Sequence, residues 1–282
     1  MNEPVGVSSD SPVSGAVTVT LNTTRDTNPS YAITREMWEQ IQAAFVQLAK
    51  DHTVRVIILR GADGRFASGA NFLELLEIVR RDRAAGNDQG AQAYWRLVNY
   101  ANTAIENCPK PVIAVIERWA LGAACALALA CDFRIAAVRP NPDRDPRRAT
   151  RIGVPAPQKG LTLGLNDTRR LVNAVGSSHA RQLLIEGREY SAEEAHAMGL
   201  IDRIVPETLL EGVVSELATR LANENAPLAM REAKANIASV VRNPGFAGLD
   251  ETSMPIAWAG SRDLEEGITA FLEGRDPVFT GE

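Results

Sequence analysis

Apolar residues along the first 140 positions alternate between short runs rich in β-branched residues and longer stretches with helical spacing. The short runs cover residues 16–21, 54–61, 111–116 and 132–138, and each is typical of a strand. Two of them, 54–61 and 111–116, are almost continuously apolar, as strands of a buried parallel sheet are. The pattern therefore predicts four strands, two of them deeply buried.

Helical patterns occupy the intervals between these strands. Thr34 is placed to cap a helix whose apolar residues recur every three or four positions. These residues are Met37, Ile41, Ala44, Phe45 and Leu48. Further helices are expected to begin at Asn71, after a glycine-rich loop at 61–69, and to cover 91–107; the alanine-rich stretch after residue 116 predicts a buried helix. Strands alternate with helices, so the fold class is α/β.

The second half of the chain has a different pattern. Residues 139–151 are rich in arginine and proline and predict an exposed loop. From about residue 169 the chain is mostly helical. Ser191 and Glu194 match a capping box, and Gly199 stands where a glycine ends a helix.

Length and composition allow a substantial folded core. The chain has 282 residues, of which 45% are hydrophobic and 23% charged, so global disorder is not expected. We predict a flexible polar tail at residues 1–15, a core at 16–206 and a helical C-terminal region at 207–282.

Charge and cysteine content exclude several classes of function. The net charge of −5 argues against nucleic acid as a partner. Cys108, Cys125 and Cys131 show neither a disulfide framework nor CxxC spacing, so no metal site is expected. The first 15 residues lack the pattern of a signal peptide, and no apolar run approaches the roughly 20 residues that span a bilayer. We predict a cytoplasmic protein with no membrane partner.

Two loops follow the buried strands and are rich in small residues. They are FASGAN at 66–71 and LGAAC at 121–125, and each is expected to lead into a helix. Helix N-termini leave N–H groups without partners, and two such groups aimed at one carbonyl oxygen form an oxyanion hole. The alternative is that the small residues only allow tight packing between helix and strand.

Few charged residues are candidates for chemistry. Asp167, in LGLNDTRR, is either an N-cap or Asx-turn residue or a nucleophile or base. Glu74 and Glu77 follow the first loop, one helical turn apart. Either both side chains lie on a solvent-exposed face of the helix, or one carboxylate points into a cleft. The histidines are expected at the surface, and a Ser–His–Asp triad has no support. They are His52, His179 and His196.

Four stretches of the chain form a further pattern. They are VRVIILRGADGRFASGANFLEL, KPVIAVIERWALGAACALALACDFRIAA, RRLVNAVGSSHARQLLIEGREYSAEEAHAMGLIDRIVP and DLEEGITAFLEGRDPVF. They resemble the crotonase (enoyl-CoA hydratase/isomerase) superfamily and occur in the family's order across about residues 16–280. The resemblance implies a spiral of ββα units and a helical C-terminal region that forms homotrimers, often paired into hexamers. It also implies a coenzyme A thioester as substrate, with no covalently bound cofactor.

Carried over by position, the resemblance assigns the oxyanion-hole N–H groups to Ala70 and Ala123. The backbone of Ala67 to Ala70 would meet the adenine end of coenzyme A, with Ser68 as a contact. Arg65 is a candidate for contact with the coenzyme phosphates, beside Lys234 and Arg275.

Two positions depart from the family pattern. The glutamates that hydratases carry in these blocks match Ala126 and Ala156 here. Hydration needs two carboxylates that position and activate water, and an alanine moves no proton. The sequence therefore predicts isomerisation, lyase or carbon–carbon bond chemistry instead of ordinary hydration.

Asp167 is the leading replacement carboxylate, with Glu74 in reserve. LGLNDTRRL resembles the GNDT stretch of the 4-chlorobenzoyl-CoA dehalogenase branch, whose aspartate is a nucleophile. That branch has a histidine on the helix matching 91–107, where this chain has Asn99 and Thr103, and a tryptophan where Lys159 stands. Asp167 is therefore predicted mainly as an acid or base.

Two other hypotheses stay open. Without both glutamates the fold would serve as a non-catalytic acyl-CoA-binding or assembly protein. Alternatively, a biosynthetic enzyme would keep the oxyanion hole but use a substrate without coenzyme A. A carboxylate within hydrogen-bond reach of the acyl site would favour an enzyme.

Overall fold

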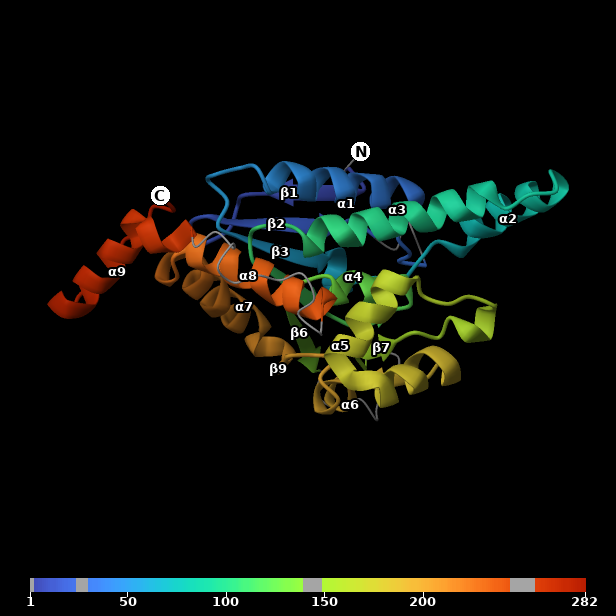
Figure 1. The fold of residues 1–282 in the computed structure, drawn as a ribbon. Helices are drawn as coiled ribbons and strands as arrows, with labels where there is room; N and C mark the ends of the chain where they lie inside the picture. Colours follow the sequence, from blue (N-terminus) through green and yellow to red (C-terminus); the bar gives the residue numbers. More distant parts are fainter. Residues whose placement is uncertain (1–2, 24–29, 139–148, 244–256) are drawn as a thin grey trace.

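The computed structural model describes residues 3–23, 30–138, 149–243 and 257–282, and two β-sheets form its centre (Figure 1). The six-stranded sheet has the order β1-β2-β3-β4-β6-β9, and the three-stranded sheet has the order β5-β7-β8. The strands are β1 (Val5–Ser8), β2 (Ala16–Leu21), β3 (Val56–Gly61), β4 (Val112–Ile116), β5 (Trp119–Leu121), β6 (Phe133–Val138), β7 (Arg151–Gly153), β8 (Glu189–Ser191) and β9 (Arg203–Pro206). The α-helices are α1 (Arg35–Leu48), α2 (Phe72–Ala84), α3 (Gln89–Glu106), α4 (Ala123–Leu129), α5 (Leu165–Arg181), α6 (Ala192–Ala197), α7 (Leu210–Thr219), α8 (Pro227–Arg242) and α9 (Arg262–Glu273).

The central strands are apolar on both sides because helices cover both faces of the large sheet. Ile57 and Leu59 of β3 pack in the cluster that contains the apolar residues of α1, α3 and α4. Val56 and Ile58, which point the other way, pack with residues of α7. Strands β2, β3, β4, β6 and β9 are parallel, so their carboxyl ends meet at one edge of the sheet.

The structure confirms the predicted α/β class and the helical C-terminal region. The run at 16–21 is β2, and the other three apolar runs lie within two residues of β3, β4 and β6. Thr34 caps α1, Asn71 caps α2, and the predicted capping box is present at Ser191.

The predicted flexible tail at residues 1–15 is wrong for Val5–Ser8. These residues form β1, which pairs antiparallel with β2, and Val5 is buried. Val7 is half exposed, so the pairing with β2 and the burial of Val5 mark this strand more clearly than its alternation does. Most of the predicted loop at 139–151 lies outside the described residues, whereas Arg151 belongs to β7.

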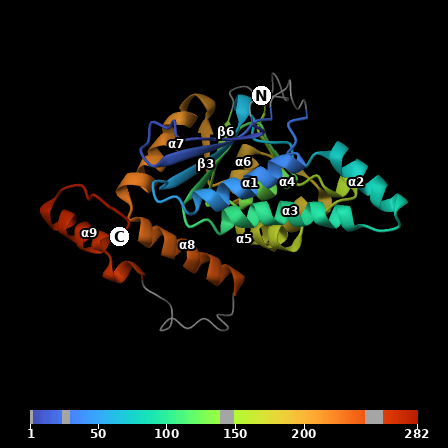
Figure 2. The same ribbon diagram turned by 90° about the horizontal axis from the view of Figure 1, so that it is seen from above.

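Helices α2 and α9 lie at opposite ends of the molecule (Figures 1 and 2). Helix α9 leaves Phe271 and Leu272 largely exposed. Within the described residues, no helix is long and apolar enough to cross a membrane.

Candidate active site

The loop from Phe66 to Asn71 lies against the segment that leads into α4. The N–H groups of Phe66 and Ala67 donate to the carbonyls of Glu117 and Trp119, at 2.9 and 3.0 Å. A Cβ at Gly69 would lie 2.7 Å from the Leu121 carbonyl oxygen and 3.6 Å from the Ala123 nitrogen. Gly69, at φ +112°, is therefore needed both for its backbone conformation and for the close approach of the two loops.

The Ala70 N–H faces away from the strand-like bridge that holds its loop. The Ile33 N–H donates to Gly69 O at 2.7 Å, and the Asn71 N–H donates to Ile33 O at 3.1 Å. In extended backbone, successive N–H groups point to opposite sides of the chain, so the Ala70 N–H points away from Ile33. The sequence pattern predicted that this free N–H would belong to a helix N-terminus. Ala70 instead precedes the helix cap Asn71, so its free N–H belongs to the extended loop.

The Ala123 N–H is free for a different reason. Ala123 is the first residue of α4, where an N–H has no acceptor inside the helix. Gly122 before it has φ +55° and would meet no neighbour if it carried a Cβ, so only the backbone conformation requires glycine there. Among the described residues, neither the Ala70 N–H nor the Ala123 N–H has a hydrogen-bond partner.

Both alanines line one cavity of about 250 Å³. Its other walls include apolar side chains from separate elements, which exclude water from a bound group. These are Phe72, Trp95, Leu121, Leu161 and Leu163. Hydrogen-bond donors act most strongly on developing charge in such a site, because the local dielectric is low.

A neighbouring cavity of about 320 Å³ holds Asp167. It shares Trp95, Ala123 and residues 161–163 with the first cavity, so the two form one connected region around Ala123. Ala156 lines the first cavity, while Ala126 is fully buried inside α4.

Asp167 lies in the first turn of α5 and is only 5% exposed. Its Oδ1 accepts hydrogen bonds from Arg170 Nη1 at 2.6 Å and from Asn102 Nδ2 at 3.0 Å. Oδ2 accepts no hydrogen bond among the described residues, and Asp167 lines the second cavity. Burial raises the pKa of Asp167 despite the opposing effects of Arg170 and Asn102.

The structure does not place Glu74 at this site. Its Oε2 accepts a hydrogen bond from the Arg35 N–H at 2.8 Å, at the start of α1. Glu74 lines neither cavity, because the first turn of α2 directs it toward α1. Its contact is that of a helix cap, and the structure does not bring it to the Ala70 and Ala123 cavity.

The residues predicted to bind coenzyme A have internal partners. Ala67 is fully buried, and the Ser68 N–H and hydroxyl donate to the carbonyls of Tyr31 and Ser30 at 2.9 and 2.6 Å. Ser68 nevertheless lines the first cavity. Arg65 stacks on the Tyr31 ring, with its guanidinium carbon 4.5 Å from the ring centroid.

The structure adds two charged residues that sequence reasoning did not assign to the site. Lys159 and Glu189 both line the cavity that contains Ala70 and Ala123. Glu189 belongs to β8, and no motif in the sequence marks it. Its place follows from strand pairing between segments far apart along the chain.

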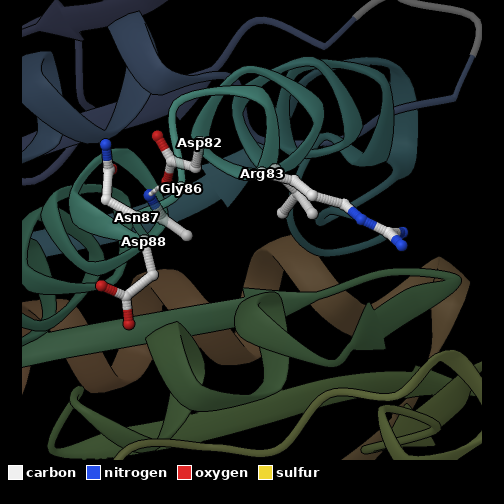
Figure 3. Close-up of a pocket in the computed structure, with 7 residues that line it drawn as sticks. Asp82, Arg83, Gly86, Asn87 and Asp88 are labelled. Atoms are coloured by element: carbon white, nitrogen blue, oxygen red, sulfur yellow. Dashed lines mark hydrogen bonds between the residues drawn. The ribbon is translucent and has the colours of Figure 1, made fainter.

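A separate cavity of about 530 Å³ lies between the end of α2 and the start of α3 (Figure 3). Figure 3 shows Arg83 directed away from the carboxylate of Asp82. Asp82 Oδ2 accepts a hydrogen bond from the Ala91 N–H at 2.8 Å, so this buried carboxylate caps the start of α3. This cavity shares no residue with the other two.

A network of ion pairs holds α5 against α3 next to Asp167. Glu106 accepts hydrogen bonds from Arg169 at 2.6 Å and from Arg170 at 2.7 Å. Burial disfavours the charge of Glu106, but these hydrogen bonds outweigh that effect and lower its pKa to about 2. The network fixes the helix turn that carries Asp167.

Glu106→Gln is expected to lower the free energy of unfolding by about 3 kcal/mol, because it leaves the buried Arg170 with one fewer anion. The pKa of Glu106 is about 2 in the folded protein, against 4.5 for the ordinary carboxyl group that represents the unfolded chain. The ion pairs of Glu106 therefore stabilise the fold fully above pH 4.5, and this stabilisation is lost as the pH falls toward about 2. Urea unfolding at pH 7 and at pH 3 measures both effects. Glu216→Gln removes an exposed ion pair with Arg220 and should change the free energy of unfolding by about 0.5 kcal/mol or less. Equal losses in the two variants would contradict the account of the network.

Comparison with known proteins identifies the family. A family model described as enoyl-CoA hydratase/isomerase matches residues 14–282. The chain belongs to the enoyl-CoA hydratase/isomerase family. It is 31% identical to 2,3-dehydroadipyl-CoA hydratase of Escherichia coli (strain K12), over 89% of each chain. It is also 31% identical to enoyl-CoA isomerase/hydratase fer4 of Mycosarcoma maydis, over 81% of this chain and 77% of that protein.

Solved structures of this family have the same fold. A crystal structure of an enoyl-CoA hydratase/carnithine racemase from Magnetospirillum magneticum superposes with a TM-score of 0.85 at 30% identity. The match covers 100% of this chain and 97% of that one. The predicted crotonase fold is thus confirmed.

Proposed function

We propose that this protein is an enzyme that acts on an acyl-coenzyme A thioester through an enolate. The observation that carries the proposal is the pair of unpartnered N–H groups of Ala70 and Ala123 in one apolar cavity. Two such donors polarise a thioester carbonyl and stabilise the negative oxygen that forms when the adjacent carbon loses a proton. The relatives at 31% identity have names that include an acyl-CoA substrate, which supports the same substrate class here.

The reaction we propose is migration of a double bond in preference to addition of water. Hydration uses two carboxylates around one water molecule. The positions that match the hydratase glutamates are Ala126, which is buried, and Ala156, which lines the cavity with a methyl group. Isomerisation needs a proton to be removed and returned, and lyase or carbon–carbon bond chemistry passes through the same enolate.

Asp167 is our candidate for the acid or base. Asp167 lines a cavity that shares Ala123 with the oxyanion site, its Oδ2 accepts no hydrogen bond among the described residues, and its raised pKa suits a group that carries a proton. A carboxylate in this position favours an enzyme over a non-catalytic binding or assembly protein. Halide displacement has less support, because Asn99 lines the cavity where the dehalogenase branch would need a histidine.

Incubation of the protein with trans-3-hexenoyl-CoA in D₂O tests this function. We expect the 2-enoyl product with deuterium in its chain, and less than a tenth as much 3-hydroxyacyl product, both measured by mass spectrometry. Butyryl-CoA in the same solvent should gain deuterium next to the carbonyl. A mainly hydroxylated product would contradict isomerisation, and no change in either thioester would contradict enolate chemistry.

Assembly into homotrimers or hexamers remains a proposal from the family resemblance, and a cytoplasmic location remains a proposal from the residue pattern. Sedimentation at several protein concentrations tests the first. A monomer at micromolar concentration would contradict it.

A further inference from the structure

The small sheet β5-β7-β8 places a carboxylate beside the oxyanion site. Its strands pair so that one row of residues faces the core and the neighbouring rows face the other side. The core row is Ala120, Ile152 and Tyr190, all at most 3% exposed. The adjacent row is Leu121, Gly153 and Glu189, so the Glu189 side chain shares a face with Leu121.

This row continues into the oxyanion site. Leu121 precedes the Gly122–Ala123 turn, and the Gly122 N–H donates to Gly153 O at 2.9 Å. A Cβ at Gly153 would lie 2.7 Å from Arg188 O and 3.0 Å from Glu189 Cα, so only glycine allows β8 to approach this closely. Glu189 consequently lines the same cavity as Ala70 and Ala123.

The Glu189 carboxylate makes no hydrogen bond to another described residue. Its charged neighbour is Arg151, whose Nη1 lies 4.0 Å from Oε2, beyond hydrogen-bond distance. Within the described part of the chain, no donor makes a hydrogen bond to this carboxylate, and its side chain is 32% exposed. Asp167 differs, because two hydrogen bonds hold its Oδ1. Glu189 thus has both oxygens available for proton transfer.

We infer that Glu189 is a catalytic residue that takes the proton from the carbon next to the thioester carbonyl. The inference rests on the proposed function, since it needs a thioester oxygen between Ala70 and Ala123. Both of those alanines and Glu189 line one cavity, whereas Asp167 lines the adjoining one, which contains Ala123 but not Ala70. We accordingly place the carbon next to the carbonyl on the Glu189 side and the more distant carbons toward Asp167.

The proposed step conserves atoms and electrons. Glu189 accepts the proton, the C–H electron pair forms a carbon–carbon double bond, and the carbonyl π pair moves to the oxygen. For a 3-enoyl thioester, protonated Asp167 then donates a proton to the fourth carbon, and the carbonyl forms again. The product is the 2-enoyl isomer, and proton exchange with solvent restores both carboxyl groups.

Glu189→Gln tests the inference, with Glu186→Gln as the matched control on an exposed residue three positions earlier. Deuterium entry into butyryl-CoA next to the carbonyl should fall by about 10²–10⁴-fold in Glu189→Gln and by less than twofold in Glu186→Gln. The dissociation constant for butyryl-CoA, measured by calorimetry, should change by less than threefold. Glu189→Asp should recover part of the exchange, because the carboxylate is kept.

The outcomes separate this inference from the proposed function. Exchange in wild type that persists at the same rate in Glu189→Gln overturns the role of Glu189 and leaves enolate chemistry standing. No exchange in wild type overturns the proposed function itself. A loss of butyryl-CoA binding equal to the loss of exchange would also overturn the inference, because it would assign Glu189 to binding.

Discussion

Ala123→Pro is expected to lower kcat for acyl-CoA turnover by about 10²–10³-fold, the usual effect of removing one oxyanion donor. Proline has no N–H, so the substitution deletes the donor itself and not merely a side chain. Ala123 is the first residue of α4, a position at which helices accept proline well. The fold should therefore persist while the activity is lost.

Ala123→Gly is the control for this substitution, because it changes the side chain and keeps the N–H. Its kcat should stay within about threefold of wild type. Stopped assays with trans-3-hexenoyl-CoA measure turnover, and circular dichroism melting shows whether both variants fold. Equal turnover in Ala123→Pro and Ala123→Gly would contradict an oxyanion hole at this residue.

Asp167→Asn is expected to lower kcat for the 3-enoyl to 2-enoyl conversion by about 10²–10⁴-fold. Asparagine has nearly the shape of aspartate and retains an oxygen that Arg170 and Asn102 can bond, but it carries no exchangeable acidic proton. Asp167→Ala should lose the same activity and also about 3 kcal/mol of stability, since it leaves Arg170 with Glu106 as its remaining anion. Comparison of the two variants thus separates chemistry from folding.

The assay for these variants uses a panel of acyl-CoAs analysed by mass spectrometry beside wild type. Asp88→Asn, on an exposed residue before α3, serves as the control and should match wild type. Unchanged turnover in both Asp167 variants would remove Asp167 from the mechanism. Its buried bonds to Arg170 and Asn102 would then be purely structural.

Local sequence patterns predict the parts of the fold whose residues are near one another along the chain. The continuous apolar run of β3 and the caps at Thr34, Asn71 and Ser191 depend on neighbouring residues, and the structure has them where expected. The sheet β5-β7-β8 was not predicted, because strands of three residues are too short to show a period. Its order depends on pairing between segments that are distant in sequence.

The same distinction applies to the site. The small residues of the two loops pointed to these segments, and the family resemblance assigned Ala70 and Ala123 within them. The positive φ angles of Gly69 and Gly122 explain why glycine precedes each alanine. The bond from Asn102 to Asp167 joins two helices and leaves no trace in either local sequence. Glu189 reaches the cavity only through the register of β7 and β8, so residue patterns alone did not indicate it.

The carbonyl ¹³C NMR signal of butyryl-CoA labelled at the thioester carbon tests the central claim most directly. Two hydrogen bonds to the oxygen withdraw electron density from this carbon. The signal should therefore move downfield on binding to wild type, and the shift should be much smaller with Ala123→Pro. Binding without a downfield shift in wild type, or an equal shift in the two proteins, would contradict an oxyanion site formed by Ala70 and Ala123.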